Sequence, residues 1–279
     1  MKDTVMNKTK CKNRAGLALL LAGSAVLLQA CGGGDDGANY VGVDSSGNVQ
    51  PATPDTPVAP SGNTGAVSAA FVKGEHARYM LIRPNGQTFG RLDTFEQTDG
   101  AVVQIDSEVL SNGVVREIAG DAGFALGRWH SGSVTNASGA VSLTGTDGRA
   151  YHYLLFNGLA ELPTSGSFTC DAGTFTAPTR ESGAGPVTAS ATGNASLVFG
   201  AEGAAVDGQI TLAGGGEATL KTTVDSTTST SITGAYFNQG AGAAVLVADA
   251  GNGAYAVAGS YRAAAGGSSY TGVYRFLCK

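Results

Sequence analysis

Glycine-containing turns divide this chain into short runs of β-forming residues, and this pattern constrains the fold more than any other feature. Gly accounts for 43 of the 279 residues, about twice its usual share of roughly 7%. After residue 65, Val, Thr, Ser, Tyr and Phe occur in short alternating runs, and no stretch keeps the 3.6-residue period of an amphipathic helix. Short strands separated by such turns predict an all-β protein, built as a sandwich or a barrel.

Residues 163–279 show the pattern most regularly. Eight strands are expected there, at 167–171, 194–199, 204–213, 216–222, 231–237, 243–248, 254–261 and 270–277. The Gly-rich connections between several of them suit antiparallel hairpins. We therefore expect an eight-stranded antiparallel β-barrel, whose closure would remove exposed sheet edges.

One expected strand, 254–261, alternates large and small residues. Its large residues Tyr255, Val257 and Tyr261 share one face, and Ala occupies positions 254, 256 and 258 on the other. Faces of this kind fit a tightly curved barrel wall. If the large face points inward, together with Tyr274 and Phe276, side chains fill the barrel. If the alanine face points inward, the barrel has room for a ligand.

A smaller β-rich region, 66–162, precedes the expected barrel. Its candidate strands are 68–72, 78–83, 101–105, 114–118, 124–129, 141–144 and 149–156. The sequence leaves open whether this region forms its own sheet or packs onto the barrel.

The N-terminus has the layout of a secretory signal. Lys8, Lys10, Lys12 and Arg14 precede an uncharged apolar run at 15–30. That run is shorter than the roughly 20 apolar residues of a spanning helix. We expect residues 1–30 to be removed on export.

The residues Leu28-Gln29-Ala30-Cys31 at the end of this run resemble the lipobox of bacterial lipoproteins. The resemblance implies that Cys31 carries lipid and that the chain is attached to a membrane only through this N-terminal lipid. Gly32, where an inner-membrane retention signal would place Asp, points to the outer membrane. The alternative is an ordinary cleaved signal with an incidental Cys. Whether the protein faces the periplasm or the cell exterior is left open.

Residues 31–65 contain few large apolar side chains and many Gly, Pro, Ser, Asn and Asp. Such a segment buries too little apolar surface to offset the entropy of ordering, so we expect a flexible tether. The net charge of the whole chain is −5, and residues 1–30 carry five basic residues against one Asp, so the chain without them has a net charge of −9. This acidity argues against a nucleic-acid partner.

Cys170 and Cys278 are the two cysteines left after Cys11 leaves with the signal and Cys31 takes lipid. We expect a disulfide between them, because the export compartment is oxidising and the first and last strands of an up-and-down barrel are neighbours. The bond would close a loop of more than a hundred residues, which contributes on the order of 4–5 kcal/mol in the chain-entropy model. Two separate buried thiols are the alternative.

No motif for catalysis, a metal or a cofactor stands out in the sequence. The three histidines, His76, His130 and His152, are dispersed and lack metal-ligand spacing. No Gly-x-Ser-x-Gly elbow and no phosphate-binding loop are found. We therefore expect a binding protein without metal or cofactor rather than an enzyme such as a hydrolase.

Four stretches in the C-terminal region, 193–200, 206–212, 232–238 and 256–261, combine small-residue strands with Gly and aromatic positions. Together they resemble the C-terminal β-barrel of surface lipoproteins of the transferrin-binding protein B and factor H-binding protein type. The resemblance covers about 162–279 and implies a surface that binds a macromolecular host or nutrient-carrier partner. It carries over no specific binding residue. The alternative function is a lipocalin-like carrier with a small apolar ligand inside the barrel.

Overall fold

The computed structural model describes residues 62–84, 86–144, 149–182 and 190–279, which form an all-β fold of antiparallel sheets with one short 3₁₀ turn. The expected signal (1–30), Cys31 and most of the expected tether lie outside the described residues. Within the described ranges, no helix has the length and hydropathy required to cross a bilayer.

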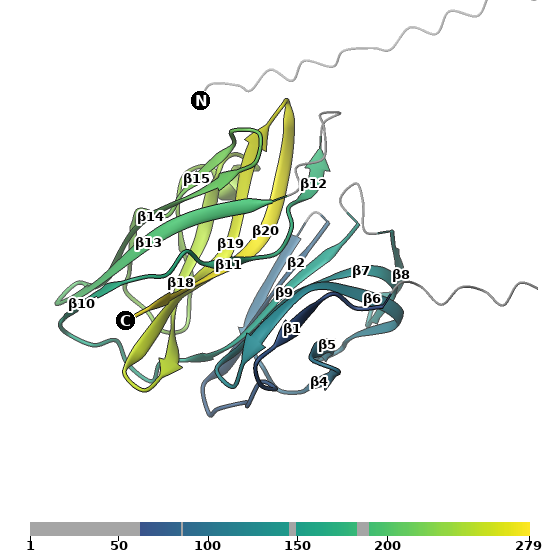
Figure 1. The fold of residues 1–279 in the computed structure, drawn as a ribbon, viewed down its shortest axis with the longest axis horizontal. Coiled ribbons are helices and arrows are strands. Elements are labelled where there is room, and N and C mark those ends of the chain that lie inside the picture. Colours follow the sequence, from purple (N-terminus) through teal and green to yellow (C-terminus); the bar gives the residue numbers. More distant parts are fainter. Residues whose placement is uncertain (1–61, 85, 145–148, 183–189) are drawn as a thin grey trace, which may run out of the picture. The chain divides into compact units, whose positions relative to one another are not determined.

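The first nine strands form the N-terminal part of a 15-stranded sheet, called the N-terminal sheet below (Figure 1). These are β1 (Gly65–Val67), β2 (Ala77–Arg83), β3 (Gly86–Arg91), β4 (Phe95–Thr98), β5 (Ala101–Ile105), β6 (Glu108–Asp121), β7 (Phe124–Asn136), β8 (Gly139–Leu143) and β9 (Tyr151–Gly158). The strand order is β3-β2-β9-β7-β6-β5-β4, with β8 on β7 and β1 parallel to β6. One face of this sheet buries Trp129, whose indole N–H donates to the carbonyl of Val102 at 2.7 Å.

The start of this sheet differs from the expected boundary at residue 66. Asn63 and Thr64, expected in the tether, are hydrogen-bonded to Val115 and Ile118 of β6. The expected strand at 68–72 is not formed, because β1 ends at Val67 and the following residues make isolated hydrogen bonds to Gly120, Ala122 and the Gln97 side chain. Residues 63 and 64 therefore belong to the folded part of the chain and not to the expected tether.

The C-terminal strands belong to two sheets, which Figure 1 draws in green and yellow. The long strands β18 (Gly242–Gly251), β19 (Ala254–Ala265) and β20 (Ser268–Cys278) form a meander, edged by β11 (Thr174–Phe175), β12 (Thr179–Ser182) and β17 (Ser231–Ile232). The second sheet consists of β10 (Gly166–Thr169), β13 (Ala191–Gly200), β14 (Gly203–Leu212), β15 (Glu217–Thr219) and β16 (Thr222–Val224).

These ladders do not form the expected eight-stranded closed barrel. The expected strand 216–222 is divided into β15 and β16, which pair with different parts of β14. The expected strand 231–237 contains only β17, because the chain turns at Gly234 with φ of +56° and enters the 3₁₀ turn. In the described residues no backbone ladder joins β16 to β17; the side chain of Ser231 instead donates to the carbonyl of Thr223 at 2.8 Å.

The predicted bond between Cys170 and Cys278 is confirmed, and it joins the two C-terminal sheets. Their Cα atoms lie 3.9 Å apart and the two residues form an isolated antiparallel bridge. Beside the bridge, Thr169 and Lys279 exchange two backbone hydrogen bonds of 3.1 and 3.0 Å. The chain passes directly from β10 into this bridge, so the first and last strands of the region are neighbours as expected.

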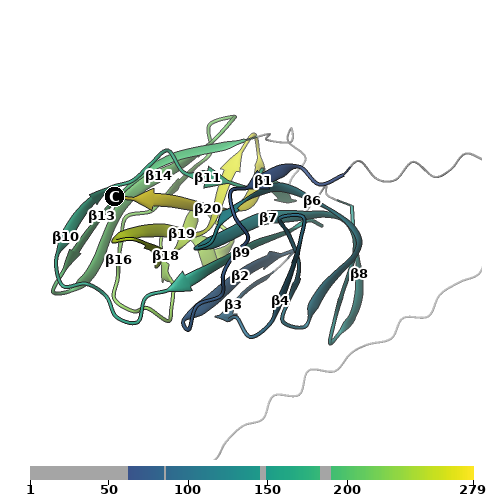
Figure 2. The same cartoon turned by 60° about the horizontal axis from the view of Figure 1, so that its bottom comes forward.

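The two faces of β19 pack against different layers. The face with Val257 and Tyr261 packs against the second C-terminal sheet, together with Tyr274 and Phe276 of β20. The opposite face, with Ala256 and Ala258, packs against residues of β2, β7 and β9. The N-terminal region is therefore not a separate sheet. Its strand β9 pairs with β18, Gly158 with Ala248 and Asn157 with Asp249, and the region also covers the alanine face of β18–β20 (Figure 2).

Candidate functional site

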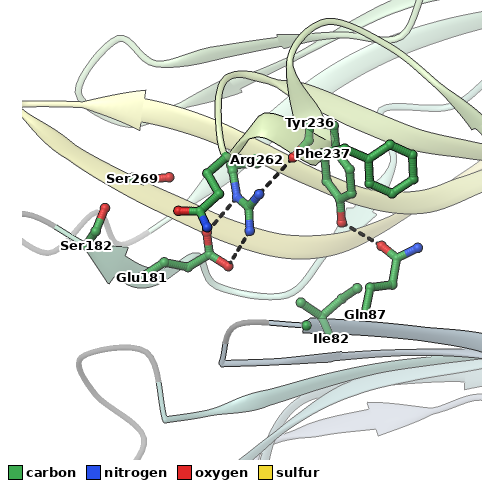
Figure 3. A pocket seen from close by; sticks show the side chains of 10 residues that line it. Ile82, Gln87, Glu181, Ser182, Tyr236, Phe237, Arg262 and Ser269 are labelled. Carbon is green, nitrogen blue, oxygen red and sulfur yellow. Dashed lines mark hydrogen bonds and ion pairs between the residues drawn. The ribbon is translucent and has the colours of Figure 1, made fainter. Parts of the chain in front are cut away.

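A cavity of about 340 Å³ lies where the β2–β3 hairpin, β12, β19 and the 3₁₀ turn Tyr236–Asn238 meet (Figure 3). Its lining combines one apolar side chain of β2, two aromatic rings, an ion pair, two amides and two hydroxyls. The lining residues are Ile82, Gly86, Gln87, Glu181, Ser182, Tyr236, Phe237, Gln239, Arg262 and Ser269.

The short turn that carries the aromatic rings is shaped by left-handed backbone at both ends. Gly234 has φ of +56° before it and Gln239 has φ of +61° after it. At Gly234, a Cβ atom would lie 2.3 Å from the carbonyl oxygen of Ala241, so no larger residue fits without backbone movement. This geometry directs consecutive aromatic side chains to different environments, with Tyr236 buried and Phe237 73% exposed.

The hydroxyl of Tyr236 connects the turn to the N-terminal sheet. It donates to Gln87 Oε1 at 2.6 Å and lies 2.5 Å from Ser260 Oγ. Ser260 Oγ also donates to Gln87 Oε1, at 2.8 Å. Because burial raises the pKa of Tyr236 to about 12, the hydroxyl keeps its hydrogen at physiological pH. The network fixes the Gln87 amide through its oxygen and does not use its nitrogen.

A partly buried ion pair closes the other side of the cavity. Arg262 of β19 donates through Nε and Nη2 to the two carboxylate oxygens of Glu181 at 2.6 and 2.9 Å. Its Nη1 donates to the carbonyl of Tyr236 at 2.8 Å, and its guanidinium lies 5.4 Å from the Tyr236 ring centroid. Burial alone would lower the pKa of Arg262, but the hydrogen bond and charge of Glu181 raise it. Both groups remain charged, and the pair is electrically neutral.

His152 is buried, and its ring contacts two threonine side chains. Its Nδ1 lies 2.7 Å from Thr176 Oγ1 and its Nε2 lies 2.9 Å from Thr179 Oγ1. Thr176 Oγ1 already accepts the N–H of Val273, so its hydroxyl hydrogen can be donated to Nδ1 while Nε2–H donates to Thr179. Burial, and to a smaller extent the charge of Arg128, hold the pKa of His152 well below its usual value. A neutral imidazole thus attaches the start of β12 to β9.

The structure does not bring the histidines together. In the described parts of the chain, no group of three or more His, Cys, Asp or Glu side chains is arranged to hold a metal ion. His130 lies on the strand next to His152, and burial, followed by the charges of Arg128 and Arg116, lowers its pKa.

A second cavity, of about 520 Å³, opens beside the β18–β19 turn and is lined in part by Arg275. The Arg275 guanidinium lies 4.1 Å from the Phe124 ring centroid and 3.9 Å from Asp121 Oδ2. Burial lowers the pKa of Arg275, whereas the nearby Asp121 and Asp171 raise it. This arginine connects β20 with the β6–β7 hairpin.

Sequence reasoning found the disulfide and missed the cavity. Cys31 lies outside the described residues, and no binding residue was assigned from sequence. Residues 236–237 were expected in a strand that runs to 237, although Gly234 and the pair Gln239-Gly240 bracket them. That bracketing is the signal that could have indicated an exposed turn. The partners Gln87 and Glu181 are distant in sequence and could not be assigned in this way.

Comparison with known proteins gave no match: no family model, no curated protein and no solved structure is similar to this chain.

Proposed function

We propose that this protein is a lipid-anchored binding protein of the outer membrane or cell surface that recognises a macromolecular partner. The anchor is Cys31, on the basis of the signal-like segment that precedes it. The tether expected from the sequence would separate the folded sheets from the bilayer. No cofactor and no catalytic step is part of the proposal.

The filled space between the C-terminal sheets is the observation that carries the proposal. Phe168, Phe199 and Tyr255 form a cluster with ring centroids 4.7–5.8 Å apart. Phe175 and Phe276 pack edge to face at 5.5 Å deeper in the same core. Side chains occupy the place that a lipocalin-like carrier would keep for an apolar ligand. This favours recognition on an outer face over transport of an enclosed ligand.

The candidate cavity supplies such an outer face. Phe237 is 73% exposed on a described surface where few other large apolar side chains are exposed. Exposed aromatic rings beside polar groups are typical of recognition surfaces, because they bury apolar area at low entropic cost. Both regions of the chain would present this face to the partner, because the β2–β3 hairpin and the C-terminal strands line the same cavity. The resemblance to transferrin-binding protein B and factor H-binding protein supports a role of this kind.

Antibody labelling of intact cells tests the anchor and the exposure together. Cells expressing the wild-type chain should be labelled by an antibody against residues 190–279, and a Cys31→Ser variant should instead appear in soluble fractions. Labelling that requires permeabilised cells would contradict surface display. Retention of the Cys31→Ser variant in the detergent phase would contradict the lipid anchor.

A further inference from the structure

We propose that the cavity around Tyr236 and Phe237 binds a neutral saccharide, which makes the recognised partner a glycan or a glycosylated molecule. This inference rests on the proposed binding function and adds the chemical class of the ligand. It is carried by three properties of the cavity: its charge, its exposed ring and its fixed hydrogen-bonding groups.

The charge of the lining excludes a strongly ionic ligand. Among the described residues that line this cavity, Arg262 and Glu181 are the only charged side chains, and they are paired through two hydrogen bonds. A free anion would meet the Glu181 carboxylate, and a free cation would meet the Arg262 guanidinium. A neutral polar ligand brings no unpaired charge into the cavity, so it avoids the free-energy cost of desolvating one.

The lining also offers hydrogen bonds in the number and geometry that hydroxyl groups require. Glu181 accepts one hydrogen bond per oxygen from Arg262, so each oxygen keeps capacity for a second. The Gln87 network leaves the two donors of its amide nitrogen unused. Ser182, Ser269 and Gln239 add groups that both donate and accept. A ligand rich in hydroxyls can satisfy this mixed set, whereas an apolar ligand would leave it desolvated.

Phe237 provides the apolar element of the site. Its ring lies 6.0 Å from that of Tyr236, at an interplanar angle of 67°, and remains mostly exposed at the cavity rim (Figure 3). A pyranose has polar hydroxyls at its edge and C–H groups on its faces, so one face can cover an aromatic ring while the edge reaches polar groups. The combination of an exposed ring with Glu, Gln and Ser side chains matches that amphipathic shape.

The site is held in place before any ligand arrives. Tyr236 is fixed by Gln87 and Ser260, and Arg262 is fixed by Glu181 and the Tyr236 carbonyl. Fixed groups lower the entropic cost of binding. The volume of about 340 Å³ lies at the lower end of the roughly 300–1,000 Å³ range of ligand sites, which suits a mono- or disaccharide unit.

The test is binding of the purified full chain to an array of neutral and acidic glycans, followed by calorimetric titration with the best neutral disaccharide. We expect a neutral glycan to bind. Replacing Phe237 by Ala should weaken its binding about tenfold, which corresponds to about 1.4 kcal/mol, because aromatic residues are enriched among the positions that carry binding energy. Val198→Ala is the matched control, because Val198 is 46% exposed on β13 and does not line the cavity.

A second variant distinguishes the loss of a contact with the ligand from the loss of the folded state. Gln239→Ala removes an exposed amide at the cavity rim, so it should weaken binding while leaving the melting temperature unchanged. Absence of binding to every neutral glycan, binding only to acidic glycans, or equal affinity in Phe237→Ala would overturn the inference. If cell-surface labelling succeeds while no glycan binds, only the saccharide inference fails. If glycans bind the purified chain while intact cells are not labelled, the proposed surface function fails.

Discussion

Tyr236 and Gln87 are 149 positions apart in the sequence, yet the tyrosine hydroxyl donates to the glutamine amide oxygen at 2.6 Å. The contact joins a turn of the C-terminal region to the β2–β3 hairpin of the N-terminal sheet. It forms one wall of the candidate cavity. The site therefore depends on both regions of the chain, and neither region alone contains it.

Removing this hydroxyl should loosen the cavity without removing its rings. Tyr236→Phe deletes one buried hydrogen bond, which contributes about 0.5–1.5 kcal/mol to the free energy of unfolding. Urea unfolding should show a loss of that size and glycan titration a weaker affinity. Tyr255→Phe is the control, because Tyr255 packs through its ring against Phe168 and Phe199. Equal stability of Tyr236→Phe and wild type would contradict the role assigned to the hydroxyl.

His152 should make folding stability depend on pH. Its pKa in the folded chain is well below the ordinary value of 6.5, so below that value the unfolded chain binds a proton that the folded chain does not. The contribution of the neutral His152 to the free energy of unfolding is then fully present above pH 6.5. It falls as the pH decreases, by up to about 1.4 kcal/mol per pH unit. The fall continues until the pH reaches the folded pKa. Urea unfolding between pH 7.5 and 5 measures this slope.

The matched variant for this effect is His152→Gln, which keeps an amide able to contact Thr176 and Thr179. It should have a smaller slope of stability against pH, whatever its absolute stability. His130 remains in both proteins, and its lowered pKa contributes in the same direction. Identical slopes for wild type and His152→Gln would rule out the buried neutral imidazole.

Reduction of the Cys170–Cys278 bond should destabilise the whole described fold. The bond spans 108 positions, for which the chain-entropy model gives on the order of 4–5 kcal/mol. Met80 and Leu154 pack in the same buried cluster as Ala258, so the N-terminal sheet should unfold together with the C-terminal sheets. Calorimetry of oxidised and reduced chains should show one transition at a lower temperature after reduction. A thiol assay that finds both cysteines reactive without reductant would contradict the bond.

The alanine face of β19 should tolerate no larger side chain. Ala258 is buried between β19 and the N-terminal sheet, and overpacking such a position costs about 1–3 kcal/mol. Ala258→Leu should lower the free energy of unfolding by that amount. Ala205→Leu, on the exposed face of β14, should change it little. A fully stable Ala258→Leu protein would show that the two layers are not closely packed there.

Alternation and glycine turns predicted the long strands of the C-terminal meander but only parts of β6 and β7. The expected 101–105 coincides with β5, and 243–248, 254–261 and 270–277 lie within β18, β19 and β20. β18, β19 and β20 pair with one another along most of their length, so the period-two signal extends over many residues there. The alternation left open which face of 254–261 points inward, and the structure places the large face in the C-terminal core.

The sequence pattern could not show that the expected barrel does not close, or where the cavity lies, because both depend on a few tertiary contacts. The division of 216–222 into β15 and β16 reflects pairing with two separate parts of β14. The turn at Tyr236 depends on left-handed backbone at Gly234 and Gln239. Its partner Gln87 belongs to β3, a strand that sequence reasoning did not assign. A one-dimensional pattern does not contain such long-range pairings.

Protease shaving of intact cells, followed by mass spectrometry of the released peptides, tests the central claim most directly. A lipid-anchored surface protein should release peptides from 190–279 while a periplasmic control protein stays intact. Disruption of the outer membrane should then add few further peptides. Release of these peptides only after disruption would place the chain inside the cell envelope and contradict the proposed surface function.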